Sequence, residues 1–91
     1  MMTIYKFLIT PTDMTFELPA GAEILTVQMQ SGSPYIWVLL DTDVPGIDRH
    51  FFVYRTGKDL GRERNDLAYI GTFQIPEDQS VFHLFEVKEK G

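Results

Sequence analysis

The 91-residue sequence contains no cysteine. This absence excludes disulfides, thiolate metal sites and a cysteine nucleophile. The length suits one domain of ordinary small size, so we interpret residues 1–91 as a single domain. A domain this small buries a modest core, and small domains without disulfides are often stabilised by oligomerisation. We therefore expect a homo-oligomer.

Basic residues are scarce in the first half of the chain. Residues 1–48 contain six carboxylates against Lys6 alone, a net charge of −5, whereas residues 49–91 contain seven residues of each sign. Nucleic-acid binding relies on neutralising phosphates with lysine and arginine, so an acidic half argues against it. The negative charge favours solubility, or a partner with a basic surface.

Long apolar segments are also missing. The longest unbroken apolar run is Tyr35–Leu40, much shorter than the roughly 20 residues of a membrane span. The first residues lack the basic and apolar regions of a signal peptide, and no lipidation motif is present. We expect a cytosolic protein without membrane association.

The run Tyr35–Leu40 lies between Gly32-Ser33-Pro34 and Asp41-Thr42-Asp43. A short apolar run bounded by turn residues predicts a central strand buried on both faces. It includes the only tryptophan, Trp37, which we expect to anchor the core or a buried subunit interface. On that interpretation, Trp37→Ala should cost roughly 3–5 kcal/mol of stability.

Alternating apolar residues predict further strands around this run, while no segment shows sustained helical periodicity. The predicted strands cover residues 3–9, 14–18, 25–30, 49–55, 69–73 and 81–87, and residues 58–67 form an exposed loop with room for a helical turn. We place Gly71 at a bulge or a close backbone approach. About seven strands with turn signals between them predict an all-β fold, a single antiparallel β-sandwich or flattened barrel.

Catalytic motifs are absent from the sequence. Serines occur in turn-like stretches without a nucleophile elbow. Thr56-Gly57-Lys58 lacks the upstream glycine of a phosphate loop, and the acidic loop that begins at Asp41 lacks two calcium ligands. We therefore expect neither an enzyme nor a cofactor or metal site.

Two histidines, His50 and His83, fall on different predicted strands. They would need to approach each other, with a carboxylate, to form a metal site or an acid–base pair. The alternation places His83 beside Phe85 and Val87. We interpret His83 as a hydrogen-bonded core residue, since a neutral ring both donates and accepts.

A group of basic residues surrounds the loop at 56–66. We consider as candidate binding residues, with Tyr54, the following: Arg49, Arg55, Lys58, Arg62 and Arg64. Arginine forks beside an aromatic ring are suited to a phosphate-bearing ligand. The same residues also suit a subunit interface that meets the acidic half of another copy, or a solvated loop balanced by nearby carboxylates.

The sequence resembles an uncharacterised family of small proteins encoded by bacteriophages and prophages. The resemblance spans nearly the whole chain and rests on the segments 4–7, 18–25, 27–30, 37–41, 51–57, 69–73 and 81–86. It implies a phage origin and a compact β fold. The family has no assigned activity, so no site residue can be transferred from it.

These observations together predict a non-enzymatic phage accessory protein. We expect it to act in the host cytoplasm by binding a host protein, such as a component of a bacterial defence system. A nucleotide-binding sponge that uses the arginine group is the first alternative. A minor virion or assembly component is the second.

Overall fold

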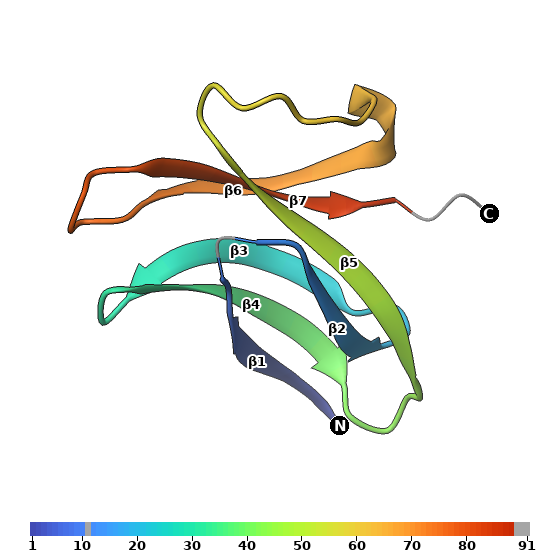
Figure 1. The fold of residues 1–91 in the computed structure, drawn as a ribbon. Helices are drawn as coiled ribbons and strands as arrows, with labels where there is room; N and C mark the ends of the chain where they lie inside the picture. Colours follow the sequence, from blue (N-terminus) through green and yellow to red (C-terminus); the bar gives the residue numbers. More distant parts are fainter. Residues whose placement is uncertain (11, 89–91) are drawn as a thin grey trace.

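The computed structural model describes residues 1–10 and 12–88, and within these ranges the chain forms seven strands and no α-helix (Figure 1). The strands are β1 Met2–Leu8, β2 Met14–Pro19, β3 Glu23–Gln30, β4 Ser33–Asp41, β5 Gly46–Arg55, β6 Leu67–Gln74 and β7 Val81–Val87. A single 3-10 turn, η1, covers Arg64–Asp66. The all-β prediction is confirmed. No helix in the described part of the chain is long and apolar enough to cross a membrane.

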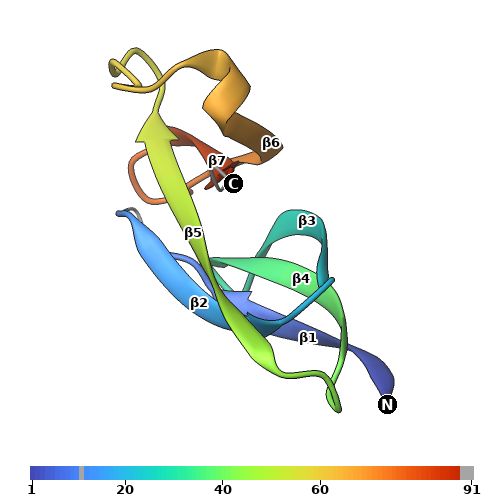
Figure 2. The ribbon, with the colours of Figure 1, turned by 90° about the vertical axis from the view of Figure 1, so that its right-hand side faces the viewer.

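The strands form two antiparallel sheets. The first sheet has the order β1-β4-β3, and the second has the order β2-β5-β7-β6. The two sheets remain separate rather than closing into a barrel, so the sandwich alternative is the correct one. The second sheet is organised by β5, whose residues 46–51 pair with β2 and residues 51–55 with β7. Figure 2 shows β5 running from the end that holds β1 and β4 to the β6–β7 end.

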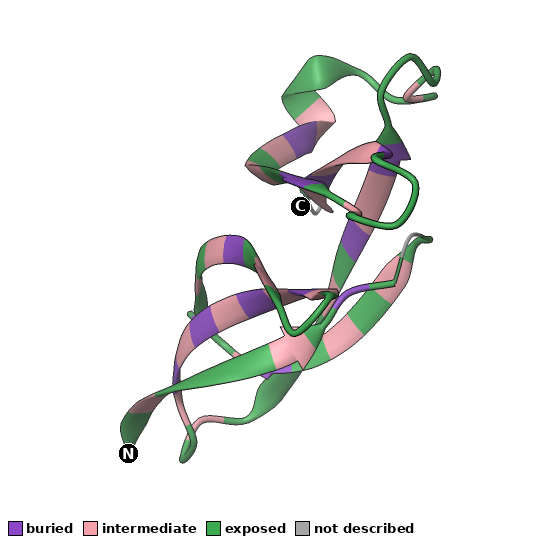
Figure 3. Ribbon diagram, turned by 90° about the vertical axis from the view of Figure 1, so that its left-hand side faces the viewer, coloured by how far each residue is buried: buried purple, intermediate pink, exposed green. Residues whose placement is uncertain are grey.

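The core lies between the sheets and is made of alternate residues of each strand. On β4, Ile36, Val38 and Leu40 are buried, and the residues between them are only partly covered (Figure 3). Phe51, Leu18 and Leu84 contribute from the second sheet. Cross-strand alternation of this kind buries one face of each sheet and leaves the other exposed.

The prediction that β4 is buried on both faces was wrong. Trp37 lies on the face of β4 that points away from the second sheet and keeps intermediate exposure. In a strand that is apolar on both faces, the sequence pattern does not show which face the other sheet covers, because both faces follow the same two-residue period. The expected core role of Trp37 is therefore corrected to a surface role.

The β3–β4 hairpin turns through Ser31 and Gly32. Both residues have positive φ angles, 52° and 83°, as the two central residues of a type I′ turn require.

Serine at position 31 is unfavourable for the first central residue of this turn, where asparagine is favoured. We expect Ser31→Asn to raise the free energy of unfolding by a few tenths to about 1 kcal/mol, measured by urea titration. Gly32→Ala is the opposite control, since a side chain there is strained, and a Ser31→Asn variant no more stable than wild type would contradict the turn assignment.

The β6–β7 connection is held by an aspartate. Asp78 Oδ1 accepts a hydrogen bond from the backbone N–H of Ser80 at 3.0 Å, and this bond lowers the pKa of Asp78 below its ordinary value of 3.8. A lowered pKa in the folded state stabilises the protein above the unfolded pKa and loses that effect as the pH falls. We expect Asp78→Asn to be less stable than wild type near pH 6, and the difference to be smaller near pH 2.5, in thermal melts across that range. An equal deficit at both pH values would contradict an ionised Asp78 as the cause.

Gly71 lies where the edges of the two sheets meet. The β6–β7 register shifts between Tyr69 and Gly71, which marks a bulge, and a Cβ at position 71 would lie 2.5 Å from Val27 Cγ1 of β3. Of the two alternatives predicted for this glycine the bulge is confirmed, and the close approach is made by the Val27 side chain rather than by another backbone. The missing side chain lets β6 pack directly on β3.

Candidate interaction surface

The face of the first sheet that points away from the core carries a row of apolar and aromatic side chains. The strand register pairs Ile4 with Leu39, Lys6 with Trp37, and Leu8 with Tyr35, so these six side chains share one side of the sheet. Leu25, the extra residue of the β3 bulge, is 42% exposed. We call these seven residues, Ile4, Lys6, Leu8, Leu25, Tyr35, Trp37 and Leu39, the outer face.

The outer face is exposed to an extent that is unusual for apolar residues. Met2, Ile4 and Leu8 of β1 are 60%, 53% and 51% exposed. Three large side chains of β4 alternate with its buried residues and retain intermediate exposure. A contiguous apolar patch on a small protein indicates an interaction site more often than a scatter of single residues does.

Lys6 lies across the middle of this face. Its ammonium group is 4.7 Å from the ring centroid of Tyr35 and 5.8 Å from that of Trp37, and it donates a hydrogen bond to Gln30 Oε1. These contacts hold the lysine flat on its own sheet, as a cation–π arrangement does. The methylene stem of Lys6 therefore adds to the apolar surface, while its charge stays near Gln30.

Acidic residues border one end of the outer face. Glu23 pairs with Leu39, and Asp41 pairs with Met2, so both carboxylates project on the outer side of the sheet. Asp43 follows in the exposed turn after β4. Part of the negative charge of residues 1–48 therefore lies at this end of the outer face.

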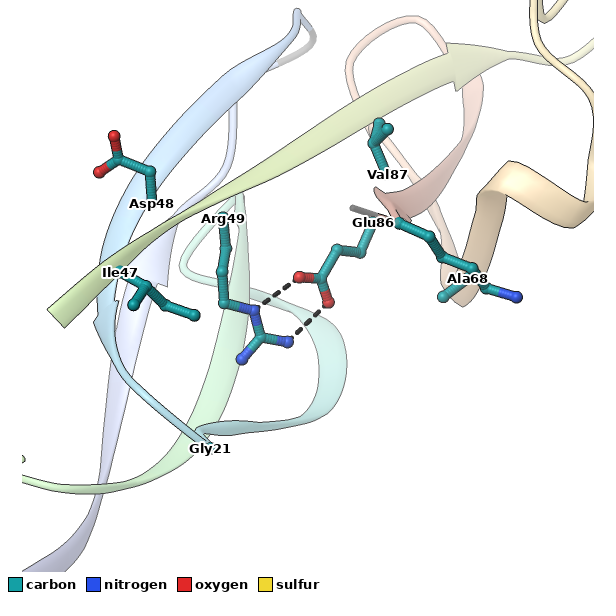
Figure 4. Close-up of a pocket in the computed structure, with 8 residues that line it drawn as sticks. Gly21, Ile47, Asp48, Arg49, Ala68, Glu86 and Val87 are labelled. Carbon is teal, nitrogen blue, oxygen red and sulfur yellow. Dashed lines mark hydrogen bonds and ion pairs between the residues drawn. The ribbon is translucent and has the colours of Figure 1, made fainter. Parts of the chain in front are cut away.

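Of the basic residues predicted to form a binding group, Arg49 lies apart from the rest. Its guanidinium forms a bidentate ion pair with Glu86 of β7, with Nε–Oε2 and Nη2–Oε1 distances of 2.6 Å (Figure 4). Nη1 donates to the carbonyl oxygen of Ala22. The hydrogen bonds to Glu86 raise the pKa of Arg49 above its already high value. Arg49 therefore joins β5, β7 and the β2–β3 connection.

Beside this ion pair the surface forms a groove of about 760 Å³. Its lining, besides Arg49 and Glu86, consists of Gly21, Ile47, Asp48, Ala68, Val87 and Lys88. Because three nitrogens of the guanidinium already donate to protein oxygens, Arg49 has limited capacity to bind an anion there.

Arg62 and Tyr54 are brought together, on the opposite side of β5 from Arg49. The Arg62 guanidinium lies 3.8 Å from the ring centroid of Phe52, and Nη1 lies 3.3 Å from the Tyr54 hydroxyl, to which it donates. Tyr54 is 8% exposed. The loop at 56–66 thus packs on the outer side of the second sheet, and its arginine serves as part of that packing.

The remaining basic residues are dispersed. Arg64 Nη1 donates to the carbonyl oxygen of Leu67 at 2.8 Å, which fastens the end of the loop to β6. Arg55 and Lys58 are exposed, and Arg55 contributes to the lowered pKa of Asp78 on the β6–β7 connection. Arg49 and Tyr54 therefore lie on opposite sides of β5, whereas Lys58, Arg62 and Arg64 lie on the connection between β5 and β6.

The two histidines make separate hydrogen bonds. His83 Nε2 lies 2.7 Å from Thr56 Oγ1, and its Nδ1 lies 3.0 Å from Thr72 Oγ1. His50 Nδ1 bonds to Thr15 Oγ1 at 2.8 Å. The predicted hydrogen bonds of His83 are confirmed, but its predicted core position is wrong, because the side chain is only partly buried and alternates with the buried Leu84 on β7. Across residues 1–10 and 12–88, no three potential metal-ligating side chains cluster together.

Comparison with known proteins identifies a family. The family model of a domain of unknown function (DUF7352) matches residues 1–91, the entire chain. No curated protein and no solved structure matches the chain.

Proposed function

Because the chain belongs to the DUF7352 family, whose function is unknown, we propose a function from its surface: it acts without catalysis, by binding another protein through the outer face. The observation that carries this proposal is the partial exposure of Trp37, Tyr35 and their apolar neighbours on one side of a three-stranded sheet. Tryptophan and tyrosine are enriched in protein interfaces and in their energetic hot spots.

The chemistry of the rim defines the partner further. Glu23, Asp41 and Asp43 lie at one end of the outer face. The Met1 ammonium binds Asp41 and Asp43 at 2.9 and 2.7 Å and offsets one of the three negative charges. The end keeps a net negative charge, so a matching partner would present an apolar patch bordered by lysine or arginine. Such charge complementarity chiefly accelerates association and makes it sensitive to salt. In keeping with the resemblance described above, we propose a phage origin, action in the host cytoplasm and a host protein as the partner, with defence components as the first class to test.

We expect Trp37→Ala to weaken partner binding strongly while the protein stays folded. Truncating a central interface aromatic costs about 2 kcal/mol or more, which is roughly a thirtyfold loss of affinity. The matched control is Tyr69→Ala, because Tyr69 is a 53% exposed aromatic residue on the second sheet. Affinity capture from host lysates followed by mass spectrometry, with all three proteins, provides the measurement.

The capture experiment has clear outcomes. A partner retained by wild type and Tyr69→Ala but lost by Trp37→Ala supports the proposal. Equal capture by all three proteins, or no specific partner from several hosts, contradicts it. A circular dichroism melt of each variant separates lost binding from lost folding.

The nucleotide alternative has weaker geometric support, since Arg49, Arg62 and Arg64 are all occupied by internal contacts. A thermal-shift panel tests it directly, because a ligand present at 100 times its Kd stabilises a protein by about 2.7 kcal/mol. Mass spectrometry of purified particles tests the virion alternative.

A further inference from the structure

The free edge of β1 offers backbone hydrogen-bonding groups that β4 does not use. Beyond the two ends of the β1–β4 ladder, Thr42 N–H donates to the carbonyl of Met1, and Ile9 N–H donates to the carbonyl of Pro34. The hydrogen-bonded pairs of an antiparallel ladder recur at every second residue. The odd-numbered residues of β1 therefore bond to β4, and the N–H and C=O groups of Met2, Ile4, Lys6 and Leu8 point to the open edge.

The other three sheet edges in the described part of the chain carry features that disfavour pairing. β3 and β6 each contain a register shift, and they meet each other where Gly71 contacts Val27. β2 is six residues long, carries Glu17 and ends at Pro19. Bulges, charges, proline and short length are the devices by which proteins protect sheet edges.

β1 has fewer of these protections than the other edge strands. Its seven residues pair with β4 without a register shift and contain no proline. Lys6 is its single charged residue, and it lies over Tyr35 and Trp37 rather than beyond the edge. A long, regular, apolar edge strand is suited to pairing with another strand.

We propose that β1 pairs antiparallel with β1 of a second copy of this chain, so that the two first sheets join into one continuous sheet of six strands. The register places Tyr5 opposite the second copy's Tyr5. Met2 then lies opposite Leu8, Thr3 opposite Phe7, and Ile4 opposite Lys6. This register uses all seven residues of β1 in both copies.

Hydrogen-bond parity and strand length both select this register. Even-numbered residues, which point their backbone groups outward, lie opposite even-numbered residues, so every outward N–H and C=O can find a partner. A shift by two residues in one direction leaves Met2 without a partner on β1. The shift in the other direction leaves Leu8 without a partner on β1.

The dimer also doubles the outer face. Both copies direct Ile4, Lys6 and Leu8 to the same side of the joined sheet. Met2 of each copy also lies opposite Leu8 of the other copy, so these two exposed side chains partly cover each other. The two outer faces become adjacent parts of one apolar surface. This proposal does not depend on the proposed function, because its test uses purified protein alone.

The register is tested by opposite charges at position 4. Ile4→Glu places a carboxylate opposite Lys6 twice in the symmetric dimer, and Ile4→Lys places two lysine pairs there. Cross-strand charge pairs contribute roughly 0.2–1 kcal/mol each, so we expect Ile4→Glu to dimerise about tenfold more tightly than Ile4→Lys. Sedimentation equilibrium measures both dissociation constants, and the difference should narrow at high salt. Equal constants, or tighter dimers with lysine, overturn the register.

Engineered cysteines test the register independently of dimer affinity, in a chain that has no other cysteine. Facing residues at position 5 form a non-hydrogen-bonded pair with Cα atoms roughly 4.5 Å apart, within the range that a disulfide spans. Oxidised Tyr5→Cys should therefore run as a covalent dimer on a non-reducing gel. Thr3→Cys, the matched control on the same face, should stay monomeric, since it faces Phe7. Wild-type protein that sediments with a mass of 10.5 kDa at all concentrations overturns the proposal, as does cross-linking of Thr3→Cys alone.

Discussion

Gly71→Ala is expected to lower the free energy of unfolding by about 1–3 kcal/mol, the usual cost of an added methyl group in a packed region. The added Cβ would lie 2.5 Å from Val27 Cγ1, closer than carbon atoms approach without displacement. The Val27 side chain, β6 or β3 must move, and this contact joins the edges of the two sheets. Gly71→Val should cost more than Gly71→Ala, because its branched side chain enlarges the overlap. Urea titration followed by tryptophan fluorescence provides the free energies.

A double-mutant cycle with Val27→Ala identifies the cause. Removing the Val27 methyl groups takes away the atom that the new Cβ would meet, so the double variant should be more stable than the sum of the two single effects predicts. Additive losses would contradict the overlap and indicate that flexibility at the β6 bulge is the important property of Gly71.

Arg49→Met is expected to destabilise the protein by about 2–4 kcal/mol. The substitution leaves the Glu86 carboxylate, in a side chain only 18% exposed, without its partner, and it removes the donor to Ala22 O. Breaking one half of a buried ion pair costs about 3–5 kcal/mol, and the residual exposure of both side chains reduces that figure. Thermal and urea unfolding measure the loss.

Two variants serve as controls for the ion pair. Arg55→Met removes an exposed arginine from the same strand, and we expect a change within about 0.5 kcal/mol. Arg49→Met combined with Glu86→Leu replaces the pair with apolar side chains, and we expect it to recover much of the lost stability. A double variant as unstable as both single losses added together would contradict a direct coupling between the two residues.

Strand positions were predictable from sequence because alternation and turn residues act locally. The last predicted strand, residues 81–87, coincides with β7, and the others differ at their ends. Gly57, in the turn after β5, has a positive φ of 90°, which glycine adopts readily. The role of Gly71 was predictable in general terms, because a glycine inside a strand usually marks a bulge or a close approach of another part of the chain.

The two surfaces that carry our proposals were not predictable in the same way. An apolar run such as Tyr35–Leu40 predicts burial on both faces, and the sequence does not show that the second sheet covers one face alone. Contacts between distant residues also leave no local pattern. Arg49 and Glu86 are 37 positions apart, and Arg62 lies in a loop of mixed charge that predicts solvent exposure rather than stacking on Phe52.

The division of β5 between two ladders has a consequence for how the molecule opens. Phe51 pairs with Met14 on one side and with Glu86 on the other, whereas the two ends of β5 are each bonded along one edge. Detachment of β2 leaves the β7 ladder intact, and detachment of the β6–β7 hairpin leaves the β2 ladder intact. Local unfolding can therefore begin independently at either end. The β2–β5 and β5–β7 ladders share Phe51, which is fully buried. Both ladders must therefore open before the residues around Phe51 are exposed to solvent.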